Sequence, residues 1–256
     1  MSGKKYFHHQ NWIAERYSLN AGFVPELGQP VVDLLKPQTG ELILDLGCGE
    51  GTLTEKLLEF ATSVIGVDNS LNQIEAAKKK GLLVCIADGH SLPFQENFDG
   101  IFSNAALHWM SSDPNAVLLE VWRALKKGGR FAAEMGGQGN VASITNALSN
   151  ALKRRNIDPD SVFPWYFPSS QTYSAQLKKA GFLISYIELF NRPTELPGDI
   201  SGWLETFGES FLFTVPSEER AYIVTEVAEE LRPHLFKKGK WIVDYVRLRF
   251  LAEKPA

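Results

Sequence analysis

The stretch ELILDLGCGEGTLTEKL, residues 41–57, decides the fold. The apolar run LILDL is followed by Gly47, Gly49 and Gly51, and then by a segment whose apolar residues recur at helical spacing. Glycine loses more conformational entropy on folding than any other residue, so this density of glycines indicates a tight turn or a ligand that approaches the main chain. The stretch therefore predicts a strand, a glycine loop and a helix, and it favours a nucleotide as the ligand.

The alternation of apolar runs and helix-like segments continues to residue 135. The strand candidates are LILDL (42–46), SVIGVD (63–68), LLVCIA (82–87), FDGIFSN (98–104) and GRFAAEM (129–135). Helix-like segments at 52–61, 69–80 and 113–127 separate them, and Asp113 and Pro114 are typical of a helix start. Continuous apolar strands separated by helices predict a parallel sheet that is covered on both faces.

The second half of the chain completes this sheet and adds to it. Two further strand-like runs, at 183–190 and 241–254, predict a C-terminal antiparallel hairpin that carries an inserted cap. The fold class is therefore α/β: a Rossmann-like, seven-stranded, mostly parallel sheet with a small helical cap. The expected domains are an N-terminal helical segment (1–40), a nucleotide-binding Rossmann-like core (41–135), cap segments (136–168 and 191–239), and segments completing the sheet (169–190 and 240–256).

The spacing of the glycine loop narrows the class of ligand. DLGCGEG reads G-x-G-x-G, which differs from the G-x-G-x-x-G of dinucleotide binders, and no Lys-Ser/Thr follows as in a P-loop. Asp68 ends the next predicted strand, where its carboxylate can accept hydrogen bonds from ribose hydroxyls. Asp88 directly follows the third predicted strand, where it can accept a hydrogen bond from an adenine amino group. Leu71 is placed to pack on the adenine face. Asp68 or Asp88 alone is explained as a helix cap or loop residue, but the two acids together favour a nucleoside site.

The motifs LDLGCGEG, GVDNS, ADGHSLPF, FDGIFSNAALHW and EVWRALKKGGRFA resemble, in this order, those of the class I S-adenosylmethionine-dependent methyltransferases. The resemblance covers residues 40–135. It implies S-adenosyl-L-methionine as the cofactor and S-adenosyl-L-homocysteine as the product. Within the family, SNAALHW is similar to the branch of trans-aconitate and malonyl-carrier-protein methyltransferases, which esterify carboxylates.

The resemblance also implies which residues bind the cofactor. In such proteins the glycines admit the methionine part, the acid at Asp45 serves its amino group, and the Asn104 carbonyl lies nearby. Tyr17 belongs to an N-terminal segment that closes over the cofactor in many relatives, although packing of an N-terminal helix explains it equally well. The full implied set is Asp45, Gly47, Gly49, Gly51, Asp68, Asn69, Leu71, Asp88, Gly89, Asn104 and Tyr17.

His108 is the candidate catalytic base, because it follows the fourth strand at the end of the sheet where ligands bind in such folds. Methyl transfer to an alcohol or carbon acid needs a base, but a carboxylate is already ionised at neutral pH. Relatives in the carboxylate branch often have Gln at this position, so the presence of a base stays open. His108 and Trp109 are alternatively packing residues at the start of the next helix.

Aromatic residues in the predicted cap and N-terminal segment suit an enclosed, partly apolar acceptor pocket. The substrate-binding candidates are Trp12, His108, Trp109, Trp165 and Trp203. Burial of the cap onto the sheet is the alternative for most of these aromatics. Arg154, Arg155 and Arg192 are candidate clamps for an acidic substrate, with a solvated helix face as the alternative for the first two.

Composition excludes several other classes. A net charge of −4 without a basic stripe argues against a nucleic-acid partner, and SNAALHW lacks the prolines of nucleic-acid methyltransferases. Cys48 and Cys85 fit a reducing compartment, no run approaches a membrane span, and no metal-ligand spacing occurs. We therefore expect a cytoplasmic protein, monomeric or weakly dimeric, with no metal and no membrane partner.

The leading functional hypothesis is S-adenosylmethionine-dependent methylation of a small molecule, at a carboxylate or hydroxyl oxygen. A cofactor-binding protein without catalysis is the alternative from another class, because its cofactor motifs would look the same. A nicotinamide-dependent oxidoreductase is a weaker alternative, because the sequence shows neither its glycine spacing nor a Tyr-x-x-x-Lys pair in position.

Overall fold

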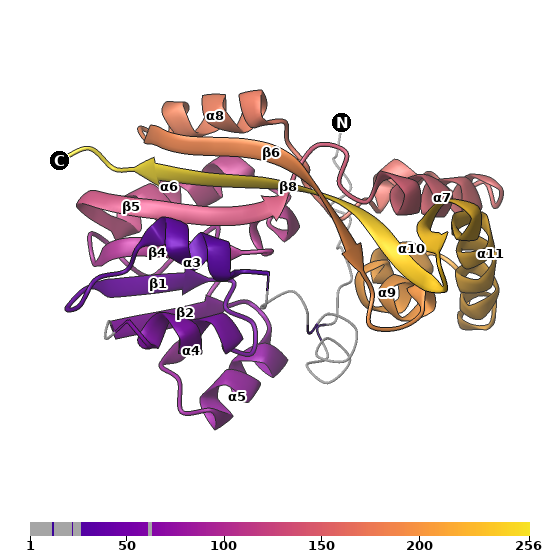
Figure 1. Cartoon of the computed structure of the whole chain (residues 1–256), viewed down its shortest axis with the longest axis horizontal. Helices are drawn as coiled ribbons and strands as arrows, with labels where there is room; N and C mark the ends of the chain where they lie inside the picture. Colours follow the sequence, from indigo (N-terminus) through magenta and orange to yellow (C-terminus); the bar gives the residue numbers. More distant parts are fainter. Residues whose placement is uncertain (1–11, 13–21, 23–26, 61–62) are drawn as a thin grey trace, which may run out of the picture. The chain divides into compact units, whose positions relative to one another are not determined.

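The structure is a computed structural model, and it describes residues 12, 22, 27–60 and 63–256. The described chain divides into two units (Figure 1). The sheet unit comprises Gly22–Gln138, Trp165–Phe190 and Val246–Ala256. The helical unit contains Trp12, Gly139–Pro164 and Asn191–Tyr245.

The sheet orders its strands β3-β2-β1-β4-β5-β8-β6, and the short β7 pairs with β8 off this path. Figure 1 shows β2, β1, β4, β5, β8 and β6 in this order. The strands are β1 (Leu42–Leu46), β2 (Ser63–Asp68), β3 (Val84–Ile86), β4 (Phe98–Asn104), β5 (Leu125–Gly136), β6 (Leu183–Glu195), β7 (Phe236–Lys237) and β8 (Lys240–Glu253). The β1–β2, β1–β4, β2–β3 and β4–β5 pairs are parallel, whereas β8 runs antiparallel to β5. The predicted mostly parallel sheet with a C-terminal antiparallel pair is confirmed.

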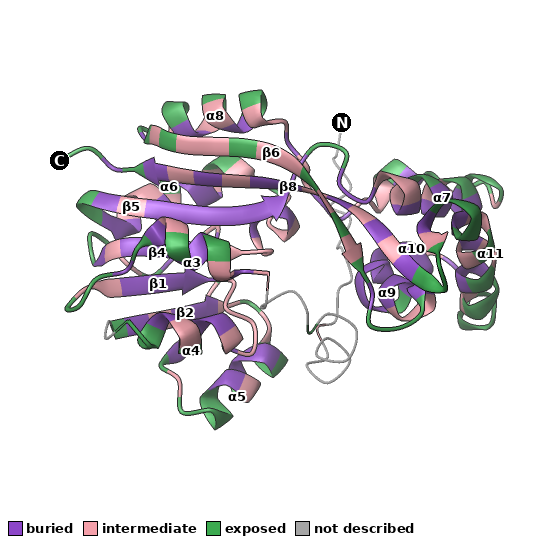
Figure 2. Cartoon of the chain, viewed as in Figure 1, coloured by how far each residue is buried: buried purple, intermediate pink, exposed green. Residues whose placement is uncertain are grey.

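Helices cover both faces of the sheet. They are α3 (Gln29–Leu35), α4 (Thr52–Leu58), α5 (Leu71–Lys79), α6 (Pro114–Ala124) and α8 (Ser170–Lys179). On one face α3 and α4 pack on Ile43, Val64 and Phe102. On the other, α6 and α8 pack on a cluster that includes Leu44 and Phe131. Figure 2 shows the resulting buried strands between helices whose outer surfaces are exposed.

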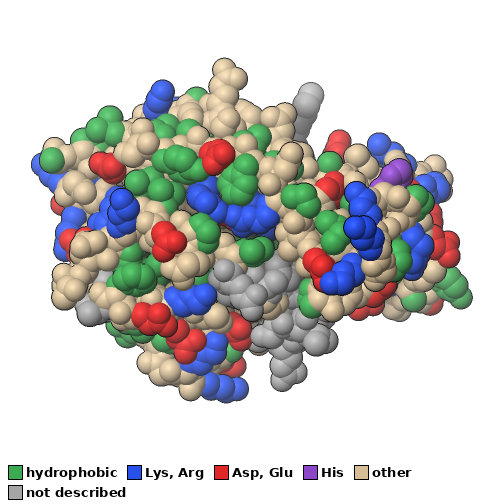
Figure 3. Space-filling model, in the orientation of Figure 1, with side chains coloured by type: hydrophobic (Ala, Val, Ile, Leu, Met, Phe, Trp, Pro, Cys, Tyr) green, Lys and Arg blue, Asp and Glu red, His purple; other side chains and the backbone are tan. Residues whose placement is uncertain are grey.

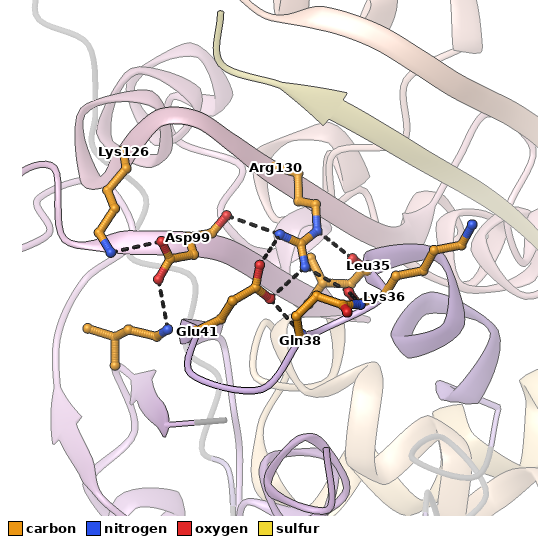
Figure 4. A network of polar contacts seen from close by, with 8 residues as sticks. Leu35, Lys36, Gln38, Glu41, Asp99, Lys126 and Arg130 are labelled. Carbon is orange, nitrogen blue, oxygen red and sulfur yellow. Dashed lines mark hydrogen bonds and ion pairs between the residues drawn. The ribbon is translucent and has the colours of Figure 1, made fainter. Parts of the chain in front are cut away.

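An ion-pair network links the C-terminal end of α3 to the N-terminal ends of the parallel strands (Figure 4). Arg130 of β5 donates to both carboxylate oxygens of Glu41 at 2.8 and 2.7 Å, and to the Leu35 carbonyl at 2.6 Å. Asp99 of β4 accepts from Lys126 at 2.8 Å and from the Leu42 backbone N–H at 2.9 Å. The hydrogen bond from Arg130 holds the pKa of Glu41 below its ordinary value. This network lies at the end of the strands opposite to the glycine loop.

The helical unit is built from α7 (Ala142–Lys153), α9 (Ile200–Phe207), α10 (Glu209–Leu212) and α11 (Ser217–Leu235). Arg154 at the end of α7 binds Glu226 and Glu230 of α11 at 2.6 and 2.9 Å, and Arg155 binds Glu226 at 2.9 Å. These contacts place both arginines in a helix–helix interface, in line with a structural role and not a substrate clamp. None of the described helices is long and apolar enough to cross a lipid bilayer.

Candidate active site

The glycine loop turns sharply out of β1 against the segment that follows β4. Gly47 has φ +78° and its N–H donates to the Val67 carbonyl at 2.8 Å. A Cβ on Gly47 would lie 2.2 Å from the Ala106 Cβ, so the two chain segments touch at this point. Ala105, with φ +55°, makes the turn that brings Ala106 to the loop, and its N–H donates to the Glu134 carbonyl at 2.8 Å. The predicted glycine and Asn104 positions therefore meet at the carboxyl ends of neighbouring strands.

Asp68, at the end of β2, is tied to the glycine loop. Its two carboxylate oxygens accept the backbone N–H groups of Gly49 at 3.0 Å and Ser70 at 2.9 Å. Burial raises the pKa of Asp68 above its ordinary value, although the N–H groups of Ser70, Gly49 and Asn69 oppose the shift. The carboxylate thus lies between the loop and the start of α5, where the sequence predicts a ribose.

The neighbouring residues suit a nucleoside. Leu71 in the first turn of α5 is 55% exposed, which leaves its apolar side chain available for contact with a ligand. The buried Gln73 has a side-chain oxygen without a hydrogen-bond partner among the described residues, and this oxygen lies 3.8 Å from the position of a Cβ on Gly49. Gly89 packs so closely on Met110 that a Cβ would lie 2.6 Å from the methionine sulfur. The exposed Leu71 and the unpaired Gln73 oxygen fit an adenosyl ligand, whereas the closeness of Gly89 to Met110 is packing within the protein.

Asp88 lies further out, after β3. One of its oxygens accepts both the His90 backbone N–H at 2.9 Å and the His90 Nδ1 at 2.7 Å, and the His90 Nε2 contacts the Ser112 hydroxyl at 2.9 Å. Burial acts to raise the pKa of Asp88, but the hydrogen bonds and charge of His90 outweigh it and hold the pKa below its ordinary value. These contacts join the Asp88 loop to the segment after Trp109.

Asp45 is the most deeply buried acid of the predicted set. Its exposed fraction is 2%, and one carboxylate oxygen accepts the Thr54 hydroxyl at 2.7 Å. Burial raises the pKa of Asp45 to about 7, with the hydrogen bond from Thr54 opposing and the charge of Asp68 adding to the shift. Asp45 therefore joins β1 to α4 inside the protein and is half protonated near neutral pH.

The raised pKa of Asp45 predicts that the stability of the folded protein depends on pH. An unfolded Asp has a pKa of about 3.9. The folded protein therefore binds more protons than the unfolded chain between about pH 4 and the pKa of about 7 of Asp45, and this contribution to stability is lost as pH rises through that window. We expect wild type to lose up to about 1.4 kcal/mol per pH unit relative to Asp45→Asn, measured by urea unfolding without ligand. Parallel pH curves for the two proteins would contradict the raised pKa.

His108 lies in a 3₁₀ turn, Leu107–Trp109, and is 6% exposed. Its Nδ1 accepts the backbone N–H of Gly136, at the end of β5, at 3.3 Å, and its carbonyl accepts the Tyr166 N–H at 2.9 Å. Burial first, and the positive charge of Arg247 second, hold the pKa of His108 well below its ordinary value. An imidazole that is neutral and accepts at Nδ1 carries its proton on Nε2, so this ring nitrogen is a hydrogen-bond donor.

The predicted aromatic residues fall into two sets. In the sheet unit the His108 ring makes tilted contacts with Trp109 and Phe167, with ring centroids 5.7 and 5.8 Å away, and the Trp165 ring lies 5.5 Å from that of Trp109. In the helical unit Trp12 and Trp203 both contact Phe207, at 6.3 and 5.1 Å. Trp203 also donates to the Tyr245 hydroxyl at 2.6 Å. Tyr17 lies outside the described residues, and the substrate-binding role of all these aromatics stays a prediction.

The sequence interpretation missed three charged residues on β5 and β8, close to the Gly136 that binds His108: Glu134, Arg247 and Arg249. Glu134 is 3% and Arg247 6% exposed, values that are rare for charged side chains. The signal was present, because an acid inside FAAEM and two arginines in alternation in RLRF interrupt otherwise apolar strands. Their proximity to each other depends on the register between β5 and β8, which pairs Glu134 with Arg249 and Gly136 with Arg247.

Known proteins of similar sequence are methyltransferases. A family model described as a methyltransferase domain matches residues 44–133. An uncharacterized methyltransferase of Schizosaccharomyces pombe is 37% identical over 95% of this chain and 98% of its own length. A trans-aconitate 2-methyltransferase of Rhizobium etli is 29% identical over 95% of this chain and 99% of its own.

Solved structures share the fold. The phosphoethanolamine N-methyltransferase 2 of Haemonchus contortus, in complex with S-adenosyl-L-methionine, superposes with a TM-score of 0.59 at 22% identity. The match covers 90% of this chain and 53% of that protein, so this chain spans about half of its length.

The fold and the glycine loop indicate the class first: α/β proteins with a mostly parallel sheet, in which ligands bind outside the carboxyl ends of the strands. The full-length match to a methyltransferase then gives the family. The chain belongs to the S-adenosylmethionine-dependent methyltransferases, and its cofactor is S-adenosyl-L-methionine. The resemblance noted in the sequence is confirmed.

Proposed function

We propose that this methyltransferase acts on a small molecule and methylates oxygen, with a carboxylate as the acceptor group. The proposal rests on the protonation and hydrogen bonding of His108. A neutral imidazole whose Nδ1 accepts the Gly136 N–H has a proton to donate on Nε2 and no lone pair there to accept one. Such a residue can orient an acceptor that is already ionised but does not suit the deprotonation of an alcohol. The near full-length similarity to a trans-aconitate 2-methyltransferase supports the same acceptor class.

We propose that the predicted cofactor residues hold S-adenosyl-L-methionine at the strand ends: the glycine loop its methionine part, Asp68 the ribose, and Asp88 with Leu71 the adenine. When bound, this cofactor supplies a methyl group activated by its sulfonium. The His108 Nε2–H would hold one oxygen of the acceptor carboxylate, and the second oxygen forms the new O–CH₃ bond. The C–S bond breaks as this bond forms, so the products are a methyl ester and S-adenosyl-L-homocysteine, with no proton removed. Aromatic walls from Trp109 and Trp165 would exclude water.

A labelled-methyl assay tests the proposal. The protein is incubated with methyl-labelled S-adenosylmethionine and a panel of small carboxylic acids and alcohols. Label that is released as methanol by mild alkali comes from an ester, whereas an ether keeps it. Label in an alkali-stable product would favour a hydroxyl acceptor. Binding of S-adenosylhomocysteine without any transfer across the panel would favour the alternative of a cofactor-binding protein.

Two substitutions of His108 test whether its side chain acts as a hydrogen-bond donor or as a base. Glutamine keeps an N–H donor, so we expect His108→Gln to retain kcat/KM within about tenfold, whereas His108→Phe loses about 10- to 150-fold, because a hydrogen bond to a charged group contributes about 1.5–3 kcal/mol. With the acid that gives the fastest ester formation, kcat/KM should show no histidine titration from about pH 5.5 to 8.5. An acid limb near pH 6.5, together with equal losses in both variants, would instead identify His108 as a base.

A further inference from the structure

Gln73, in the first turn of α5, is a buried polar residue with an unpaired acceptor. It is 4% exposed, and its side-chain oxygen has no hydrogen-bond partner among the described residues. By contrast, Figure 3 shows Lys, Arg, Asp and Glu side chains at the molecular surface of the face drawn, where water can solvate them. Buried polar groups in proteins are nearly always hydrogen-bonded, because an unpaired one loses its hydration without compensation. The amide oxygen of Gln73 therefore indicates a partner from outside the described chain.

The unpaired oxygen borders the glycine loop. A Cβ on Gly49 would lie 3.8 Å from the Gln73 oxygen, and, apart from its chain neighbours, it would meet no other described atom within 4 Å. The backbone N–H of the same glycine donates to a carboxylate oxygen of Asp68 at 3.0 Å. Gln73 and Asp68 thus both lie against Gly49, and each brings an acceptor oxygen to this residue of the loop.

The turn at the start of α5 fixes the backbone of Gln73 relative to Asp68. The Ser70 N–H donates to Asp68 at 2.9 Å, and the Ser70 hydroxyl accepts the backbone N–H of Gln73 at 3.5 Å. The last side-chain torsion of glutamine has a broad energy profile, so the amide can rotate without disturbing this cap. The oxygen can therefore turn from its buried position toward a ligand beside Asp68.

The chemistry of the two acceptors suits a ribose. A ribose carries two neighbouring hydroxyl groups, and each hydroxyl donates one hydrogen bond. Each oxygen of Asp68 already accepts one backbone N–H, and a carboxylate oxygen can accept one more. The amide oxygen of Gln73 accepts without a charge, so it adds an acceptor beside Asp68 without the cost of a second buried carboxylate. One hydroxyl for each residue pairs the oxygen of Gln73.

We propose that Gln73 is a second ribose-binding residue of this enzyme: its amide oxygen accepts one hydroxyl of the cofactor ribose, while Asp68 accepts the other. The site then selects nucleosides in which both hydroxyls are present. This inference rests on the proposed position of the ribose at Asp68, and it is independent of the proposed acceptor of the methyl group.

The test compares S-adenosylhomocysteine with its 2′-deoxy and 3′-deoxy analogues by calorimetric titration. The variants are Gln73→Met and Gln73→Leu, which remove the acceptor but keep an apolar side chain, and the control is Gln95→Met at an exposed position before β4. We expect the Kd for S-adenosylhomocysteine to rise about 3- to 10-fold in both Gln73 variants, as for the loss of one neutral hydrogen bond. Gln95→Met should stay within twofold of wild type.

The analogues identify the bond that is lost. Wild type should bind both deoxy compounds more weakly than S-adenosylhomocysteine. In Gln73→Met the penalty for one analogue should fall below twofold, whereas the penalty for the other should persist. Urea unfolding without ligand is the second readout: removal of an unpaired buried acceptor should leave the midpoint of Gln73→Met equal to or above that of wild type.

Three results would overturn the role of Gln73. The first is an unchanged Kd for S-adenosylhomocysteine in Gln73→Met, and the second is a penalty that stays the same for both analogues in this variant. The third is a lower urea midpoint with an equal loss of affinity for all three ligands, which would mean a distorted loop. Each of these leaves the ribose at Asp68 standing, whereas equal binding of all three ligands by wild type would overturn that position as well.

Discussion

Asp68→Ala is expected to remove almost all stabilisation by S-adenosylhomocysteine. The carboxylate accepts the N–H groups of Gly49 in the glycine loop and of Ser70 at the start of α5, so its loss removes the acceptor of both and also the proposed acceptors for the ribose. Hydrogen bonds to a charged group contribute about 1.5–3 kcal/mol each, so we expect Kd to rise at least about 100-fold. At a ligand concentration of about 100 times the wild-type Kd, the stabilisation should fall from roughly 2.7 to about 0.4 kcal/mol, measured by thermal shift and calorimetry.

Asp99→Ala is the matched control. Asp99 also accepts a backbone N–H, that of Leu42, and binds Lys126, but it lies at the opposite end of the same sheet (Figure 4). This variant should unfold at lower denaturant while its Kd for S-adenosylhomocysteine stays within twofold of wild type. A ligand-induced shift in Asp68→Ala equal to that of wild type would contradict the assignment of Asp68 to the cofactor.

The sequence predicted the strands of the sheet best where an apolar run ends at a turn signal. β1, β2 and β4 begin and end where expected, at 42–46, 63–68 and 98–104. β3 is shorter than the predicted 82–87, because it is an edge strand that pairs only with β2 and leaves Leu83 66% exposed. β6 and β8 extend beyond the predicted hairpin, to Glu195 and from Lys240, because their pairing continues into the helical unit.

Some residues of the candidate site could likewise be predicted from the sequence, and others could not. The cofactor residues lie at the carboxyl ends of successive parallel strands, so their convergence follows from the order of strands and needs no side-chain detail. The largely buried charges of β5 and β8, Glu134, Arg247 and Arg249, are different. Glu134 and Arg249 are 115 positions apart, and a shift of one residue in the β5–β8 register would turn both arginines to the other face. Sequence periodicity alone does not define that register, so the contact between Glu134 and Arg249 could be found only in the structure.

Gly47→Ala is expected to lower the free energy of unfolding by about 2–5 kcal/mol. About 1–2 kcal/mol of this comes from placing a Cβ in the left-handed region, where Gly47 has φ +78°. The rest, about 1–3 kcal/mol, comes from overpacking, because the new Cβ would lie 2.2 Å from the Ala106 Cβ. Urea unfolding measures the loss, provided that the m-value is unchanged.

Gly40→Ala measures the cost of the left-handed backbone conformation without overpacking. Gly40 has φ +86°, but a Cβ there meets no atom within 4 Å, so this variant should lose only about 1–2 kcal/mol. Relief of the collision at Gly47 requires Ala106 to move, and His108 is two residues further along the same turn. Gly47→Ala should therefore also weaken methyl transfer, whereas Gly40→Ala should leave it unchanged. Equal losses of stability in the two variants would mean that the loop and the segment after β4 are not in contact, and the route by which Gly47 positions His108 would fail with them.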